Sequence, residues 1–354
     1  MNTEKVYCYI GRFQISHTAH EETIKYALSK CDRLVLLVGS SDLARDPKNP
    51  FTFNERFKVL EGVCTRLAQE QWSTGRKVVF NILPVHDHIY NNNKWINEVQ
   101  NQVLSVTDSK DIVLTGLKKD DSSYYLNFFP HWKSDLMKEV IKDGEKTINS
   151  AEIRNEYFRT GKVPNVNLPK ESVEFLEKFL VSDFSTFELL REELDFITRY
   201  RAEMELKLPY KTIPFLTGDC LVSVAGNILV GVRRNFPGRG LFCVPGGFMS
   251  GITDKDQVDT AIRELYEETA LKVPEKVLRG NIRKVEEFGD FNRSLRWRII
   301  TKCVYIQLPD QTLPKIKGSD DLAKCFWMPI SEIVKNRDKF FEDHFFILEN
   351  MLGI

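Results

Sequence analysis

The chain has 354 residues, of which 42% are hydrophobic and 28% charged, and this length and balance suit two globular domains. Its 50 basic and 50 acidic side chains cancel, which argues against nucleic acid as the main partner, because counterion release needs clustered positive charge. The seven cysteines form no CxxC pair, so we expect neither a disulfide framework nor a cysteine zinc site. No apolar run approaches about 18 residues, and the first residues lack the order of a signal peptide. We therefore expect a cytoplasmic protein without a membrane partner.

The first half of the chain contains four short apolar runs, at residues 6–11, 33–40, 77–85 and 111–116. They are rich in Val, Ile and Leu without polar alternation, which is typical of central strands in a parallel sheet. Amphipathic segments of helical period lie between them, for example at residues 21–29 and 54–68. Strands that alternate with helices predict an open α/β sheet that binds ligands at the carboxyl ends of its strands.

The character of the sequence changes twice after that. Residues 169–206 are helical and charged, and we interpret them as a connector between a domain at 1–168 and a second domain at 207–354. The second domain starts with two strand-like runs joined at Ala225-Gly226-Asn227, a hairpin turn pattern. A helix is expected from about residue 255 to 269, followed by strand-like residues 296–308. This order predicts a mixed α+β sandwich.

The first candidate site follows the first predicted strand. That strand runs into Gly11-Arg12-Phe13-Gln14, and His17 and His20 come where a helix begins. A helix N-terminus presents free N–H groups to a phosphate, and two histidines three residues apart can stabilise charge that develops on it. Adenylyl transfer requires mainly such positioning and electrostatics, without a covalent nucleophile. Taken alone, two histidines at a helix start are more often surface or capping residues.

The context favours the catalytic interpretation. The stretch from Gly11 to His20 resembles the nucleotidylyltransferase superfamily, whose signature is HxGH, with Ala19 here in place of glycine. A second signature, ISxTxxR, is similar to residues 148–154, where Asn149 replaces Ser and Ala151 replaces Thr. The resemblance implies a Rossmann-like domain in which His17, His20 and Arg154 are catalytic, and Arg154 grips polyphosphate. It also implies ATP or phosphate contacts from Gly11, Arg12, Phe13, Gln14, Arg45, Lys118, Asp120, Ser122 and Asn149.

Three further stretches are similar to the nicotinamide-mononucleotide adenylyltransferase branch that is fused to Nudix domains in bacteria. They are residues 39–56, Asn92 with Trp95, and residues 118–126. The resemblance implies that ATP and nicotinamide mononucleotide give NAD and pyrophosphate. Asn92 and Trp95 would bind the mononucleotide, since a cationic pyridinium ring stacks well on indole.

Several alternatives stay open for this half. Trp95 can be a core aromatic, residues 118–121 can be a solvated charge run, and the acceptor can be phosphopantetheine or a phosphocholine-like ester instead. His86 and His88 flank Asp87, and we favour a loop near the nucleotide over a metal site there.

The second candidate site resembles a Nudix box. Gly246-Gly247-Phe248 is followed by Arg263-Glu264-Leu265-Tyr266-Glu267-Glu268. On a helix, Glu264, Glu267 and Glu268 share one face, and such oxygen ligands suit Mg²⁺ or Mn²⁺, which would activate water, with Glu267 as the catalytic residue. The plainer alternative is a solvated acidic helix.

The box departs from its consensus. Its loop is two residues too long, so the first acid is absent or has moved to Asp254 or Asp256, and Ala270 replaces the final glycine. Residues 293–296 and 342–345 look like ADP-ribose-processing relatives, which implies that Arg296 binds ADP-ribose, while Trp297 is expected to crowd that pocket. We therefore expect either hydrolysis of ADP-ribose-like nucleotides or a non-catalytic sensor of a NAD metabolite. A homo-oligomer is compatible with the sequence.

Overall fold

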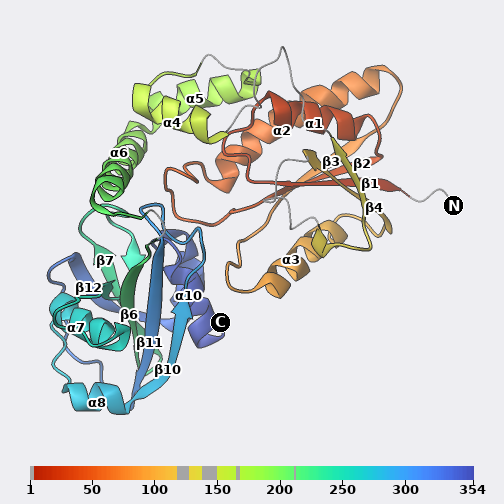
Figure 1. Cartoon of the computed structure of the whole chain (residues 1–354). Helices are drawn as coiled ribbons and strands as arrows, with labels where there is room; N and C mark the ends of the chain where they lie inside the picture. Colours follow the sequence, from red (N-terminus) through yellow and green to blue (C-terminus); the bar gives the residue numbers. More distant parts are fainter. Residues whose placement is uncertain (1–3, 118–126, 138–149, 165–167, 211–212) are drawn as a thin grey trace. The chain divides into compact units, whose positions relative to one another are not determined.

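The computed structural model describes residues 4–117, 127–137, 150–164, 168–210 and 213–354. The chain divides into two compact units, Met1–Arg191 and Glu192–Ile354, whose boundary falls inside helix α6 (Phe184–Lys207) (Figure 1). Each unit has its own sheet.

The sheet of the first unit is entirely parallel among the described residues. Its order is β3-β2-β1-β4-β5, and its strands are β1 (Lys5–Gly11), β2 (Arg33–Val38), β3 (Val79–Pro84), β4 (Asp111–Leu117) and β5 (Lys133–Met137). The prediction of a Rossmann-like parallel sheet is confirmed. Strand β5 was not predicted, because its sequence KSDLM is short and polar.

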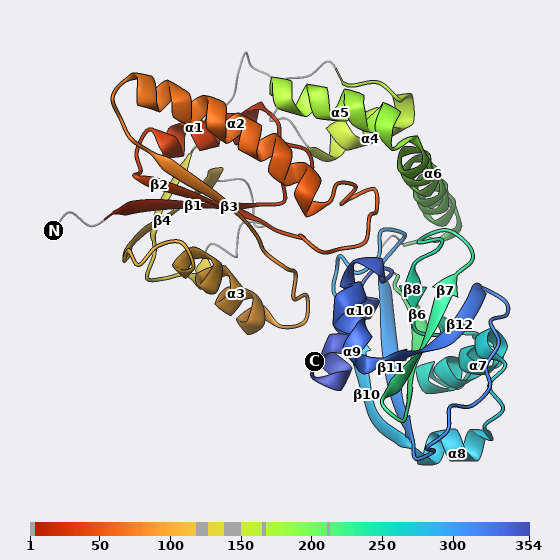
Figure 2. The same cartoon turned by 180° about the vertical axis from the view of Figure 1, so that it is seen from behind.

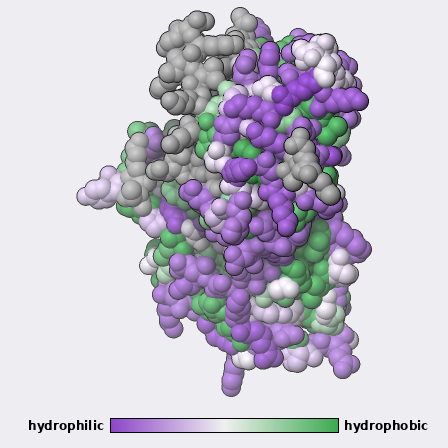
Figure 3. Space-filling model, turned by 90° about the vertical axis from the view of Figure 1, so that its right-hand side faces the viewer, coloured by the Kyte–Doolittle hydropathy of each residue, from purple (hydrophilic) through white to green (hydrophobic). Residues whose placement is uncertain are grey.

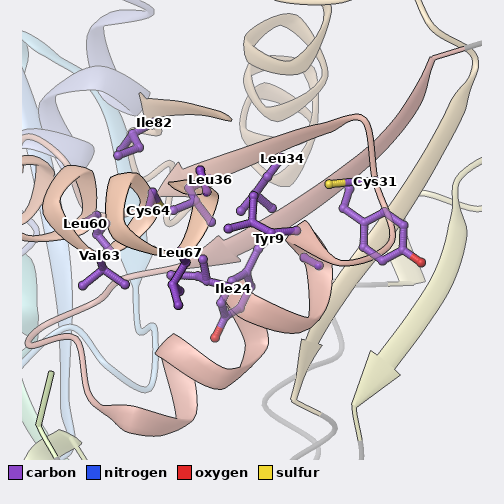
Figure 4. Close-up of a cluster of buried hydrophobic side chains, with 14 of the residues drawn as sticks. Tyr9, Ile24, Cys31, Leu34, Leu36, Leu60, Val63, Cys64, Leu67 and Ile82 are labelled. Atoms are coloured by element: carbon purple, nitrogen blue, oxygen red, sulfur yellow. The ribbon is translucent and has the colours of Figure 1, made fainter. Parts of the chain in front are cut away.

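Helices cover both faces of this sheet, which explains why its strands lack polar alternation. Tyr7 and Tyr9 of β1 pack in a core cluster with α1 (Thr18–Leu28) and α2 (Phe53–Ser73), as Figure 4 shows for Tyr9. Val6 and Cys8 pack in a second cluster with α3 (Asn92–Leu104). Figures 1 and 2 show α1 and α2 on one side of the sheet and α3 on the other.

Two further helices hold the loop after β2. Helices α4 (Ser150–Thr160) and α5 (Lys170–Ser182) contribute Phe158 and Phe179, which surround Phe51 at ring-centroid distances of 6.3 and 5.3 Å. Thr52 and Glu55 then form a reciprocal capping box that starts α2. The end of this loop that leads into α2 is therefore fixed by these contacts.

The second unit contains a seven-stranded mixed sheet. Five strands follow the order β10-β11-β6-β7-β12, while β8 pairs with β7 and β9 with β6. The strands are β6 (Phe215–Val224), β7 (Asn227–Arg233), β8 (Phe242–Cys243), β9 (Gly246–Phe248), β10 (Ile282–Phe288), β11 (Ile299–Leu308) and β12 (Leu322–Pro329). The predicted hairpin is confirmed: Ala225 and Gly226 both have positive φ, 47° and 75°, as its tight two-residue turn requires.

Helix α7 (Gln257–Thr269) packs closely on β6. A Cβ atom on Gly218 would lie 2.2 Å from the carbonyl oxygen of Gln257, so only glycine permits this approach. The remaining helices are α8 (Glu275–Gly280), α9 (Ile330–Ile333), the 3₁₀ segment η2 (Val334–Lys339) and α10 (His344–Leu352). Figure 2 shows α7 and α10 on opposite sides of the sheet.

Polar residues dominate the face of the chain drawn in Figure 3, and apolar residues gather there in smaller separate areas. Within the described ranges, no helix has the length and apolar character needed to cross a membrane.

Candidate active sites

The histidine pair lies at the carboxyl end of β1. His17 is the N-cap of α1 and is fully buried, while His20 stands in the first turn. The two imidazole rings stack with centroids 3.9 Å apart. The backbone N–H of His17 donates to Nδ1 of His20 at 3.3 Å, so a neutral His20 carries its proton on Nε2. The pair is thus held in one orientation at a helix N-terminus, where a phosphate would bind.

The side chains of Phe13 and Gln14 hold the turn between the strand and the helix. Phe13 has a left-handed backbone (φ 50°), and its ring packs edge-on against Tyr9 and His20. A Cβ on Gly11 would approach the Phe13 ring to 2.9 Å. The amide of Gln14 is buried and exchanges two hydrogen bonds with the backbone of Phe51, at 2.8 and 3.0 Å. Gln14 therefore fastens this turn to the loop after β2.

Arg154 reaches the same turn from α4. Its guanidinium donates to the carbonyl oxygens of Gln14 and Pro47, and burial lowers its pKa to about 10. The structure therefore brings Arg154 beside the histidine-bearing turn, as the second signature predicts, although its bonds go to backbone carbonyls.

Two other arginines lie close by. The side chain of Arg12 is exposed and its nearest polar partner is Asn49, at 3.5 Å. Arg45 forms a bidentate ion pair with Glu55, with two nitrogen–oxygen distances of 2.8 and 2.9 Å. Arg45 thus links the loop after β2 to the first turn of α2.

Arg56 is a feature that the sequence alone did not single out as a site residue. It is 2% exposed, and it donates to the carbonyl oxygens of Arg12, Gly39 and Ser40 at 2.6, 2.7 and 2.8 Å. One guanidinium thereby ties together the carboxyl ends of β1 and β2. Local sequence gives no sign of this, because an arginine in a helical stretch usually faces water.

The proposed mononucleotide residues lie at the start of α3. Asn92 is exposed, and Trp95 is half-buried against Phe128 and Phe129 at centroid distances of 6.4 and 6.0 Å. Trp95 joins the edge of the core cluster below α3, so it has one packed side.

Two imidazoles of the loop before α3 bind one carboxylate of that helix. Glu98 contacts Nδ1 of His86 at 2.6 Å and Nε2 of His88 at 2.8 Å. Asp87 accepts from the hydroxyl of Ser40 at 2.7 Å, which joins this loop to the end of β2. Of the remaining predicted contacts, Lys118, Asp120, Ser122 and Asn149 lie outside the described residues.

In the second unit, the three carboxylates of the box lie at a cavity of about 620 Å³. Glu264 and Glu267 each accept from Nη1 of Arg263 at 2.7 Å. Glu268 is 4% exposed and accepts from the backbone N–H of Gly246 at 2.9 Å. Burial, reinforced by the charge of Glu264, raises the pKa of Glu268 to about 8. Of the three box carboxylates, Arg263 therefore pairs with two, and the third is buried on a backbone N–H.

The donor set fits a hard divalent cation, since it consists of carboxylate oxygens in an electronegative pocket. A Cβ on Gly247 would lie 2.4 Å from Oε1 of Glu264, so the backbone closes directly over this carboxylate. In the arrangement seen, no three His, Cys, Asp or Glu side chains of the described residues are close enough to share an ion. Arg263 draws Glu264 and Glu267 to itself in that arrangement.

Asp254, one of the two candidates for the displaced acid of the box, contacts Arg263. Its carboxylate, 2% exposed, accepts from Nε and Nη2 of Arg263, both at 2.9 Å. This bidentate bond holds the pKa of Asp254 well below its usual range. Asp256 has a different function: it caps α7 by accepting from Val258 and Asp259. Sequence counting left both aspartates open, and the contacts separate them.

Opposite the acidic helix, the cavity is lined by basic and aromatic side chains. The guanidinium of Arg296 lies 5.7 Å from the ring centroids of both Phe248 and Phe341, and one of its nitrogens lies 3.5 Å from Glu342. Trp297 is not among the lining residues; its indole donates to the carbonyl of Ile213 at 2.9 Å, so the expectation that it crowds the pocket is wrong.

A buried network supports this wall. Arg293 makes a bidentate ion pair with Asp343 at 2.9 and 3.0 Å, and it lies 3.8 Å from Asp219. Burial raises the pKa of Asp219 to about 6 and lowers that of His344 to about 3. Sequence reasoning noted residues 293–296 and 342–345 only by resemblance, and Asp219 not at all.

These two sites define the class of the protein: a nucleotidylyltransferase-type domain followed by a Nudix domain. Comparison with known families agrees, since a cytidylyltransferase-like model matches residues 8–117 and a NUDIX domain model matches residues 219–349.

Individual relatives are more specific. The nicotinamide/nicotinic acid mononucleotide adenylyltransferase of Acinetobacter baylyi is 32% identical over 176 residues, which cover 49% of this chain and 86% of the relative. A solved bifunctional NMN adenylyltransferase/ADP ribose pyrophosphatase of Francisella tularensis is 30% identical with a TM-score of 0.85, covering 99% of both chains. A second structure of this kind, complexed with AMP and a manganese ion, gives 29% identity and a TM-score of 0.84. The chain belongs to this family of bifunctional NMN adenylyltransferase/Nudix proteins.

Proposed function

We propose that the first unit transfers the adenylyl group of ATP to nicotinamide mononucleotide. A phosphate oxygen of the mononucleotide attacks the α-phosphorus of ATP, and the bond to the β-phosphate breaks, so that NAD forms and pyrophosphate leaves with the electron pair. The observation that carries this proposal is the stacked pair of His17 and His20 at a helix N-terminus beside β1. Donors fixed in this way stabilise charge as it develops, without rearranging during the reaction.

The surrounding arginines support binding of a polyanion. Arg56 and Arg154 are buried, and the hydrogen bonds that the structure gives them go to backbone carbonyls. Their charges are therefore not cancelled by a bonded carboxylate, and they add positive potential beneath the turn that carries Arg12. We assign Gly11, Arg12 and Phe13 to the ATP phosphates.

The direct test supplies the full chain with ATP and Mg²⁺ together with nicotinamide mononucleotide, nicotinic acid mononucleotide or phosphopantetheine in separate reactions. We expect a dinucleotide and pyrophosphate from a pyridine mononucleotide. Product from phosphopantetheine alone would refute the acceptor assignment.

Trp95 is proposed to stack on the pyridinium ring. Trp95→Ala should then raise the KM for the mononucleotide by about tenfold, equivalent to roughly 1–2 kcal/mol, and leave the KM for ATP nearly unchanged. Trp95→Phe should restore much of the affinity. Equal weakening of both substrates with a lower melting temperature would instead assign Trp95 to the core beside Phe128 and Phe129.

For the second unit, we propose hydrolysis of ADP-ribose or a similar nucleoside diphosphate derivative. The bidentate contact between Asp254 and Arg263 carries this proposal, because it supplies the acid that the lengthened loop lacks at its consensus position. Glu264, Glu267 and Glu268 would hold Mg²⁺ or Mn²⁺, which supplies Lewis-acid activation when bound. Arg296 and the rings of Phe248 and Phe341 would bind the nucleotide.

The test for this unit is release of AMP and ribose 5-phosphate from ADP-ribose by the full chain with Mn²⁺ or Mg²⁺. Tight ADP-ribose binding without product would favour the sensor instead. We further propose that residues 169–206 connect two domains at 1–168 and 207–354, and that the protein acts in the cytoplasm.

A further inference from the structure

The cavity of the second unit is lined by seven described Asp and Glu side chains, and six of them are hydrogen-bonded. These six are Glu264 and Glu267 on Arg263, Glu268 on Gly246, Asp219 on Thr301, Asp321 on Asn235 and Glu342 on Ser294. Asp320 is the seventh, and within the described chain it has no hydrogen-bond donor or ion-pair partner. Its side chain is also exposed, so solvent reaches it within the cavity.

The position of Asp320 is set by the end of helix α7. The backbone N–H of Ser319 donates to the carbonyl of Glu268 at 2.9 Å, and the Ser319 hydroxyl donates to the carbonyl of Glu267. Lys317 adds a backbone bond to Thr269 at 2.8 Å. Two of the helical residues that anchor this loop are therefore box carboxylates, and the loop brings the next residue, Asp320, to the same cavity.

The backbone at Asp320 is itself unusual. Its φ is 50°, in the left-handed region that residues with a Cβ atom adopt uncommonly. Its charge also reaches the box: the pKa of Glu264 is raised mainly by burial, with Asp320 among the charges that add to the effect. A strained residue that places a carboxylate without a bonded partner beside a reaction site is a candidate for chemistry.

We infer that Asp320 is the general base of the Nudix reaction, an assignment that rests on the hydrolase function proposed above. A water molecule gives its proton to the Asp320 carboxylate while its oxygen forms a bond to one phosphorus of ADP-ribose. The bond from that phosphorus to the bridging oxygen breaks, and the electron pair leaves with the other phosphate. AMP and ribose 5-phosphate result, and the proton passes from Asp320 to solvent.

The other carboxylates are poorly suited to this role. A base needs a lone pair that is accessible to water and free of a competing donor. Glu264 and Glu267 share one guanidinium nitrogen, and Glu268 is buried on a backbone N–H. Their common helix face suits them to hold a cation, which would reduce their basicity further.

The experiment uses the full chain with Asp320→Asn, Asp320→Ala and Asp320→Glu. Asp310→Asn is the control, since this nearby aspartate does not line the cavity. AMP release from ADP-ribose with Mn²⁺ gives kcat and KM, Mn²⁺ binding is measured separately by electron paramagnetic resonance, and ADP-ribose binding by calorimetry without metal. We expect Asp320→Asn to lower kcat by about a hundredfold or more, with both affinities within about twofold of the unmodified chain. Added formate should partly restore Asp320→Ala but not Asp320→Asn.

Three results would overturn the assignment in different ways. If Asp320→Asn keeps kcat within about threefold, Asp320 is not the base, whereas the hydrolase function stands. A tenfold loss of Mn²⁺ affinity would make Asp320 a cation ligand instead. If the unmodified chain releases no AMP while it still binds ADP-ribose, the proposed function itself fails and the base assignment fails with it.

Discussion

Asp254 and Asp256 provide a sharp test of how the altered box works, because the two residues are neighbours with different contacts. Asp254 is 2% exposed and accepts two bonds from Arg263, one from the Ser250 backbone and one from the Thr260 hydroxyl. Asp254→Ala removes all of these and leaves Arg263 without its strongest partner.

The magnitude follows from burial on each side of the pair. Breaking a fully buried ion pair costs about 3–5 kcal/mol, but the Arg263 side chain is 25% exposed and water can replace part of the loss. We therefore expect a loss of about 2–3 kcal/mol. For a unit of this size the entropy of unfolding is on the order of 0.3 kcal/mol per degree, so the melting temperature should fall by roughly 7 °C. Asp256→Ala removes only a helix cap, costs about 1 kcal/mol, and should lower the melting temperature by roughly 3 °C.

Activity separates the two variants further. Without Asp254, Arg263 is held only by the cation-binding carboxylates and by the carbonyl of Phe248, so ADP-ribose hydrolysis should fall at least tenfold in Asp254→Ala. Asp256→Ala should retain hydrolysis, and both variants should synthesise the dinucleotide normally, since the adenylyltransferase site lies in the other unit. The assay is AMP release, with calorimetric melting on the same samples. A larger loss of hydrolysis in Asp256→Ala than in Asp254→Ala would refute the reasoning.

Three other predictions concern single residues. His17→Ala or His20→Ala should lower the kcat of dinucleotide synthesis about a hundredfold with less effect on ATP affinity, and near-normal turnover in the double variant would exclude their role. Ala270 ends α7 with a left-handed backbone, φ 50°, which glycine adopts without strain. Ala270→Gly should therefore stabilise the second unit by about 0.5–1 kcal/mol in thermal unfolding, after the larger entropy of unfolded glycine is subtracted. An unchanged or lower melting temperature would contradict this. Burial lowers the pKa of His344 from 6.5 to about 3, so the unfolded chain takes up the proton first as pH falls, and stability is lost below about pH 6.5. Between pH 7.5 and 5 the free energy of unfolding of the unmodified chain should fall by about 2 kcal/mol more than that of His344→Asn. Asp219, whose folded pKa is raised to about 6, contributes in the opposite direction, but it is present in both chains and cancels in this difference. Equal losses in the two chains would argue against a buried neutral His344.

The elements that sequence predicted well share a local cause. Unbroken Val, Ile and Leu runs located β1 to β4, because strands covered on both faces need no polar alternation. The hairpin before Asn227 was predictable because its turn needs two residues with positive φ, and Ala225-Gly226 supplies the glycine. Strand β5 has neither signal, and it forms only because β4 offers it an edge.

The site residues were likewise predictable only where their signal is local in the sequence. Motif spacing located His17, His20 and the box glutamates, whose meaning lies in a few consecutive residues. Arg56 falls in the stretch 39–56 that carries the resemblance, but its role could not be found in this way, since its four carbonyl partners come from segments up to 44 residues away. Nor could counting choose between Asp254 and Asp256, because the choice depends on how the loop folds back on Arg263.

The guanidinium of Arg263 also determines how the second unit tolerates chelators. In the folded chain it already neutralises part of the charge of Asp254, Glu264 and Glu267, as an internal counterion. Small domains that fold around their metal unfold when it is removed, because binding energy and folding energy are the same quantity there. Here the helix face is held together by a residue of the chain itself. EDTA should therefore stop hydrolysis while the melting temperature changes by no more than a degree or two, and the activity should return as soon as Mn²⁺ is added back.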